Sequence, residues 1–191
     1  MLQPVDYFKI IHTYIPPDSS LYKIYLPHVS LVTAKALRLA QNLHLSPEQQ
    51  RFIEEAAMLH DIGIIEVKPY SLMDHHGNLP YICHAPAGRA ILEREGLPRH
   101  ALIAERHIGV GISKHEILEH NLPLPPRDML AESIEEKVIS WADLFFSKTP
   151  QQLWHEKSLS EVQEHVRRYG IRQAHVFQTW SQEFVFSAEP L

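Results

Sequence analysis

The chain has 191 residues, of which 45% are hydrophobic and 21% charged, and this composition is ordinary for one soluble domain with a sizeable core. The formal net charge of −5 argues against a sequence-independent nucleic-acid binder, because such a protein needs a basic face. The single cysteine, Cys83, excludes an internal disulfide and a zinc site built mainly from thiolates. No apolar stretch has the length of a signal peptide or membrane span, so we expect a cytoplasmic protein without membrane contact.

Apolar residues recur at helical spacing along most of the chain. The first predicted helix covers residues 21–43, and Pro27 indicates that its regular part begins there. The clearest predicted helix covers residues 47–61, because Ser46 is a suitable N-cap and Gly63 stops the helix.

Prolines and glycines separate the segments that follow. They predict a loop over residues 64–83. Further helices are predicted at about 85–95, 98–107, 113–120, 131–147, 158–169 and 171–185. No segment shows sustained strand alternation. The predicted fold class is therefore all-α: a single globular helical bundle spanning residues 1–191, with a core at about 20–147 and C-terminal helices in 150–191 packing on it.

Histidine is the unusual residue, with fourteen in the chain. His60 and Asp61 end the clearest helix and follow small residues on its inward side, His28 opens an amphipathic helix, and Asp143 lies within the apolar run VISWADLFF. Each residue alone has an ordinary interpretation as a core histidine or a capping aspartate. Together, carboxylates among apolar residues need a partner or a metal. Two histidines and two aspartates from three helices suit a divalent Fe, Mn, Co, Ni or Zn ion.

The order of these four residues, with HDIG at the central pair, resembles the HD superfamily of metal-dependent phosphohydrolases over roughly residues 20–147. The resemblance implies an all-α domain of the HD type. It also implies that His28, His60, Asp61 and Asp143 hold a metal ion. His60 and Asp61 would be the catalytic residues of the site.

Two further segments resemble HD proteins related to the HD-GYP group. His84 begins HAPAGRAIL, and His107 lies in ALIAERHIGVG. This resemblance implies that His84 and His107 complete a second metal position and that Asp61 bridges the two ions. Ile64 stands where the family often has lysine, Ile108 stands where a second histidine is usual, and the GYP motif is absent. These departures favour a plain HDIG phosphohydrolase over a cyclic-dinucleotide hydrolase. They are compatible with a site that holds either one metal ion or two.

The predicted function is hydrolysis of a phosphate ester or anhydride through a metal-activated water, with a nucleotide as the favoured substrate. Arg89, Arg106 and Lys68 are the candidates for binding substrate phosphate, although helical arginines are more often surface charges. Two alternatives remain: an HD-like di-iron oxygenase, and a non-catalytic ligand-sensing HD module. Assembly into a homo-oligomer through the C-terminal helices is also open.

Overall fold

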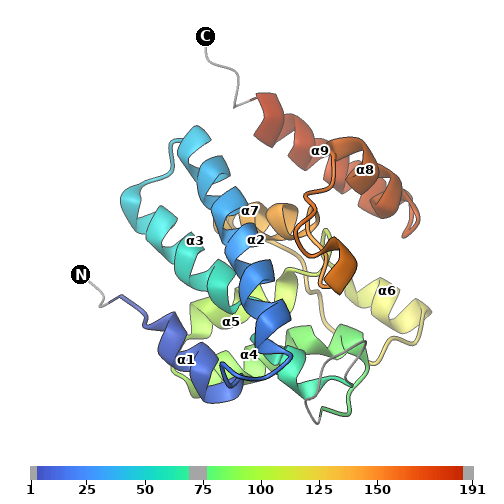
Figure 1. The fold of residues 1–191 in the computed structure, drawn as a ribbon. Helices are drawn as coiled ribbons and strands as arrows, with labels where there is room; N and C mark the ends of the chain where they lie inside the picture. Colours follow the sequence, from blue (N-terminus) through green and yellow to red (C-terminus); the bar gives the residue numbers. More distant parts are fainter. Residues whose placement is uncertain (1–3, 69–76, 187–191) are drawn as a thin grey trace.

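The computed structural model describes residues 4–68 and 77–186, and over these ranges the chain is helical (Figure 1). Extended pairing there is limited to two isolated backbone bridges, Val67 with Leu79 and Ile112 with Met129. The predicted all-α fold class is confirmed. The centre of the predicted 64–83 loop lies outside the described residues. None of the described helices is long and apolar enough to cross a lipid bilayer.

The first long helices, α2 (Tyr22–Asn42) and α3 (Pro47–Leu59), lie side by side (Figure 1). A capping box starts α3, because Ser46 and Gln49 exchange side-chain and backbone hydrogen bonds. The predicted start of α2 at Pro27 is wrong, since Pro27 lies inside the helix. The turn before it stays helical because Tyr25 is buried and its hydroxyl donates to the carbonyl of Met58 at 2.8 Å.

A short helix, α1 (Tyr7–Tyr14), is absent from the predicted elements. The carboxylate of Asp6 accepts a hydrogen bond from the backbone N–H of Lys9 and so caps its first turn. Ile11 and Ile15 are fully buried, and they pack in a cluster with the first turn of α2. Tertiary burial, rather than a long periodic pattern, therefore holds this segment helical.

The 3₁₀ helices η1 (Ile62–Glu66), η2 (Tyr81–Cys83) and η3 (Pro150–Gln152) are absent from the predicted elements, and the first two overlap the predicted 64–83 loop. The remaining α-helices match the predicted segments, mostly within one or two residues at each end. They are α4 (His84–Arg94), α5 (Pro98–Arg106), α6 (Lys114–Glu119), α7 (Ile134–Asp143), α8 (Leu159–Arg167) and α9 (Ile171–Phe186). The exception is α7, which is shorter than the predicted 131–147. Ser133 caps its start, and it ends at Asp143, after which the chain turns back toward the core.

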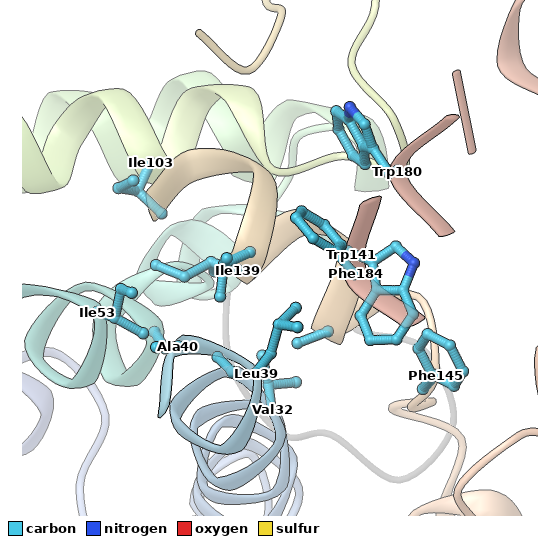
Figure 2. Close-up of a cluster of buried hydrophobic side chains, with 14 of the residues drawn as sticks. Val32, Leu39, Ala40, Ile53, Ile103, Ile139, Trp141, Phe145, Trp180 and Phe184 are labelled. Atoms are coloured by element: carbon cyan, nitrogen blue, oxygen red, sulfur yellow. The ribbon is translucent and has the colours of Figure 1, made fainter. Parts of the chain in front are cut away.

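The largest apolar cluster joins α2, α3, α5 and α7 to the C-terminal helices (Figure 2). Val32, Ile53 and Ile139 belong to this cluster, and Trp141 meets the ring of Phe184 edge-on at a centroid distance of 5.6 Å. Full burial of a valine, isoleucine or phenylalanine side chain stabilises the fold by roughly 1.5–3 kcal/mol. The C-terminal helices therefore pack on the core, and in Figure 1 they lie beside α7.

Candidate metal centre

The two carboxylate oxygens of Asp61 face two different groups of histidines. Asp61 is fully buried in the turn between α3 and η1. Its Oδ2 lies 3.1 Å from Nε2 of His28 and 3.3 Å from Nε2 of His60. Its Oδ1 lies 3.4 Å from Nε2 of both His84 and His107. One buried carboxylate thus stands between two sets of nitrogen atoms.

The first group gathers residues from α2, the end of α3 and the end of α7. Asp143 Oδ1 lies 3.0 Å from Nε2 of His28 and 3.5 Å from Nε2 of His60. Together with Asp61, these residues offer four ligand atoms that all lie within 4.8 Å of one another. Three helices distant in sequence therefore supply the first group, as the spacing of the motif predicts.

The second group consists of Asp61 with His84 at the start of α4 and His107 at the end of α5. Nδ1 of His84 lies 2.7 Å from the carbonyl oxygen of Tyr81, and Nδ1 of His107 lies 2.9 Å from that of Ala104. Each ring nitrogen must donate there. The two Nε2 atoms, 3.1 Å apart, then present lone pairs to each other, and this arrangement is favourable when they share a cation.

Burial and neighbouring charge set the protonation of the group. Burial lowers the pKa of His84 to about 3, so its imidazole is neutral at pH 7. Burial alone would lower the pKa of His60, but the charges and hydrogen bonds of Asp61 and Asp143 together outweigh this effect and raise the pKa to about 10. Burial would raise the pKa of Asp61 and of Asp143, yet the Lys148 ammonium and the neighbouring histidines together hold both well below their usual range. Both carboxylates are therefore anionic, as metal ligands must be.

Buried polar atoms without a hydrogen-bond partner concentrate in the first group. Among the described residues, they belong to His28, His60, Asp61 and Asp143, and otherwise only to Arg106 Nε. Oδ2 of Asp61 nevertheless has an ion-pair partner, because the Lys148 ammonium lies 2.7 Å away. Asp61 also makes no side-chain capping bond to η1, which removes the capping interpretation. Buried polar atoms normally have partners. Imidazole and carboxylate atoms left without them fit a divalent transition-metal ion, which would complete their coordination.

Lys148 is a site residue that the sequence analysis missed. Its Nζ lies 2.7 Å from Oδ2 of Asp61, and its side chain is only 11% exposed. It lies five residues after Asp143, in the segment that turns back from α7. Ile64, at the position where the family often has lysine, is buried in an apolar cluster. The sequence feature that could have indicated Lys148 is its position as a basic residue soon after Asp143.

The three predicted phosphate-binding residues lie elsewhere. Arg89 pairs with the buried carboxylate of Glu105, and Arg106 pairs with Glu136 at 3.2 Å. Lys68 is exposed. None of the three lines the cavity that opens at the histidines. The structure therefore brings together the six predicted metal ligands but not the predicted phosphate-binding residues.

A cavity of about 510 Å³ adjoins the metal centre, within the range usual for small-molecule sites. At its inner end lie His84, His107, Asp143 and Lys148. Its wall is mostly apolar, formed by Ile82, Ile108, Val110, Ile112, Leu122, Leu144, Phe146 and Val166. The arrangement suits a ligand with an anionic end near the metal centre and an apolar body.

Residues 25–146 match the HD domain family, and the chain belongs to this family. Solved structures of the HD domain of the L. monocytogenes phosphodiesterase PgpH share its fold. One has a TM-score of 0.53 at 14% identity and covers 95% of this chain and 97% of that chain. Another, in complex with cyclic-di-AMP, has a TM-score of 0.54 at 14% identity and covers 99% and 100%. At this identity the likeness concerns the fold.

Three curated relatives match part of the chain. Proteins named tRNA (cytidine(56)-2′-O)-methyltransferase match at 31% identity, from Thermoplasma volcanium over 77% of this chain and 37% of the relative, and from Picrophilus torridus over 73% and 39%. An uncharacterised protein of Methanocaldococcus jannaschii is 44% identical over 45% of this chain and 43% of its own length. The chain spans less than two fifths of the methyltransferases it matches.

Proposed function

We propose that this protein is a metal-dependent phosphohydrolase that acts on a small phosphate ester or anhydride, with a nucleotide as the favoured substrate. The observation that carries the proposal is the position of Asp61, whose two oxygens face separate histidine groups at 3.1–3.4 Å. Bridging carboxylates of this kind suit two-metal hydrolytic sites. Membership of the HD family supports the same reaction class.

Six residues would hold the metal in two overlapping sets. The first set is His28, His60, Asp61 and Asp143, and the second is Asp61, His84 and His107. The chemistry that such ions supply when bound is a lower pKa for a water ligand and polarisation of a phosphoryl oxygen. Backbone carbonyls at Ala57, Tyr81 and Ala104 accept from the Nδ1–H groups and so orient the Nε2 atoms of His60, His84 and His107.

Lys148 would bind the substrate phosphate in place of the predicted Arg89, Arg106 and Lys68. Its ammonium group stands where the cavity meets the metal centre, beside Asp61. A lysine ammonium is a compact positive charge with three donors, which suits phosphate oxygens. Lys148 lines the cavity, whereas Arg89 and Arg106 do not and pair with Glu105 and Glu136 elsewhere.

The test is phosphate release by protein loaded with Mn, Fe or Co, measured on a panel of nucleoside mono-, di- and triphosphates. A short oligoribonucleotide with a terminal phosphate belongs in the panel, because two relatives are named as tRNA methyltransferases. We expect Asp61→Asn to abolish hydrolysis and Asp18→Asn, at an exposed position, to leave it unchanged.

Each alternative has its own signature. Oxygen consumption by the iron-loaded protein, without phosphate release, would favour a di-iron oxygenase. Tight nucleotide binding without turnover on any metal would favour a ligand-sensing module. Hydrolysis that survives Asp61→Asn would overturn the proposed site.

A further inference from the structure

The outer wall of the cavity is built by the C-terminal segment, residues 148–173. Beyond Lys148, this segment contributes Lys157, His165, Val166, Tyr169 and Gln173 to the lining. All of them lie after the stretch that matches the HD family, residues 25–146. This part of the lining therefore lies outside the stretch that matches the family model.

This wall is firmly attached to the core. Arg172 donates to both carboxylate oxygens of Glu116 on α6, at 2.9 and 2.8 Å, and to the carbonyl of Gly111 at 2.6 Å. Val162 and Val166 of α8 are buried in the largest apolar cluster. Lys157 donates to the carbonyl of Leu144 at 3.2 Å. The wall is therefore a fixed part of the binding surface.

Aromatic rings stand at the outer end of this wall. The imidazole of His165 and the phenol ring of Tyr169 lie edge to face, with centroids 5.3 Å apart and an interplanar angle of 75°. Tyr169 is 66% exposed although it lines the cavity, so part of its ring is accessible to a ligand. Apolar side chains, among them Leu144 and Phe146, line the same cavity as these rings and the metal centre.

The charge along the cavity is suited to an anion. Lys148 lies at the inner end and Lys157 on the C-terminal wall. The acidic group Glu116, which also lines the cavity, is neutralised by its pairing with Arg172. The other acidic residue of the lining is Asp143, which belongs to the metal centre and lies beside His28 and His60.

We propose that the C-terminal segment forms a subsite for the base of a nucleotide, with Tyr169 as the residue against which the base stacks. The proposal rests on the hydrolase function and names its substrate as a base-bearing phosphate. A ring that stacks on an aromatic side chain gains affinity with little dependence on its identity. The subsite therefore separates nucleotides from phosphorylated sugars rather than one base from another.

The test compares equilibrium binding of adenosine 5′-monophosphate, uridine 5′-monophosphate and ribose 5-phosphate to the metal-free chain by calorimetry, where no turnover interferes. We expect both nucleotides to bind about tenfold more tightly than the sugar phosphate. Tyr169→Ala should remove this preference and Tyr169→Phe should retain it. Trp154→Ala is the control, because Trp154 is 72% exposed on the same segment but does not line the cavity.

The results separate the two proposals. Equal binding of nucleotide and sugar phosphate, or a preference that survives Tyr169→Ala, would overturn the subsite. If the preference depends on Tyr169 but the metal-loaded protein hydrolyses none of the panel, the subsite stands and the hydrolase proposal fails. If both stand, Tyr169→Ala should raise KM for nucleotides about tenfold while kcat and turnover of ribose 5-phosphate are unchanged.

Discussion

Lys148 places its ammonium nitrogen 2.7 Å from Oδ2 of Asp61, the same oxygen that faces His28 and His60. The lysine thus neutralises the buried carboxylate when no metal does. It also stands beside the position that a metal ion would share with these ligands. We therefore expect Lys148 to stabilise the metal-free protein and to weaken its affinity for metal.

Replacement of Lys148 by methionine should separate these effects. We expect the metal-free protein to lose several kcal/mol of unfolding free energy, because a buried carboxylate loses its partner. Mn²⁺ should bind more tightly and raise Tm by more than in the unsubstituted protein. Turnover of a phosphate substrate should fall about 10–100-fold, because the positive charge near the phosphate is gone.

The matched control for this substitution is Lys35→Met. Lys35 is similarly buried and pairs with Glu156 at 2.7 Å, but it does not line the cavity. Its replacement should leave metal affinity and turnover unchanged. Weaker metal binding in Lys148→Met would show that Lys148 supports the metal centre instead of competing with it.

Substitutions of metal-ligand residues should show whether the two ligand sets of the centre bind separate ions. His107 serves only the Oδ1 side of Asp61, so His107→Ala should reduce the metal content from about two ions per chain to about one. Asp61→Ala should reduce it to none, because both sides lose their shared ligand. Elemental analysis after purification without chelator measures both, with the exposed His175→Ala as the control. One ion per chain in the unsubstituted protein would contradict the dinuclear assignment.

Gly63 allows the backbones of η1 and α4 to touch. A Cβ atom at this position would overlap the carbonyl oxygen of His84 and the backbone nitrogen of Gly88. We expect Gly63→Ala to cost more than about 2 kcal/mol of unfolding free energy and to reduce metal content by displacing His84. Gly96→Ala is the comparison: its φ of +74° strains alanine, but nothing lies within 4 Å, so the cost should be only about 1 kcal/mol. Equal costs in urea unfolding would refute the close-contact explanation.

The ion pair between Glu116 and Arg172 should make stability depend on pH. Burial would raise the pKa of Glu116, but Arg172 and Ser113 outweigh it and lower the pKa to about 2. A depressed folded pKa gives stability that is present above the unfolded value of 4.5 and is lost as pH falls toward 2. Glu116→Gln should therefore cost about 2 kcal/mol at pH 7 and progressively less below pH 5.

Urea unfolding at several pH values measures this difference. Glu119→Gln is the control, because its carboxylate lies on the same helix but is 56% exposed. A Glu116→Gln deficit that stays constant from pH 7 to pH 3.5 would rule out the ionic contribution.

The sequence predicted which residues gather at the candidate metal centre, but the residues it predicted for phosphate binding lie elsewhere, and the difference has a physical reason. His28, His60, Asp61 and Asp143 stand among apolar neighbours, so helical periodicity alone turns them inward. Whether a basic side chain can reach the cavity depends on its angular position around its helix and on the course of the loops. Arg89 follows His84 by five residues, about 140° around the helix, and its side chain therefore turns to Glu105. Lys148 reaches Asp61 only because the chain folds back after α7, which no local pattern reveals.

In the fold as well, features set by local sequence were predicted and features set by tertiary contacts were not. Ser46 and Ser113 form capping boxes at the predicted helix starts, because capping is local chemistry. Pro27 misplaced the start of α2, because the buried Tyr25 keeps the preceding turn helical. Helix α1, which the sequence analysis did not predict, likewise depends on the burial of Ile11. The sequence pattern of so short a segment does not reveal that burial.

The contact between Gly63 and the backbone of α4 has a consequence for the thermodynamics of ion binding. Main-chain atoms, rather than side-chain rotamers, set the spacing between Asp61 and His84, because Gly63 abuts the carbonyl oxygen of His84 and the nitrogen of Gly88. The ligand framework is thus preorganised, and the entropy of bringing its halves together is lost during folding. Metal capture should then proceed with little conformational rearrangement, and its free energy should respond to ion size more than the free energy of a flexible chelator would.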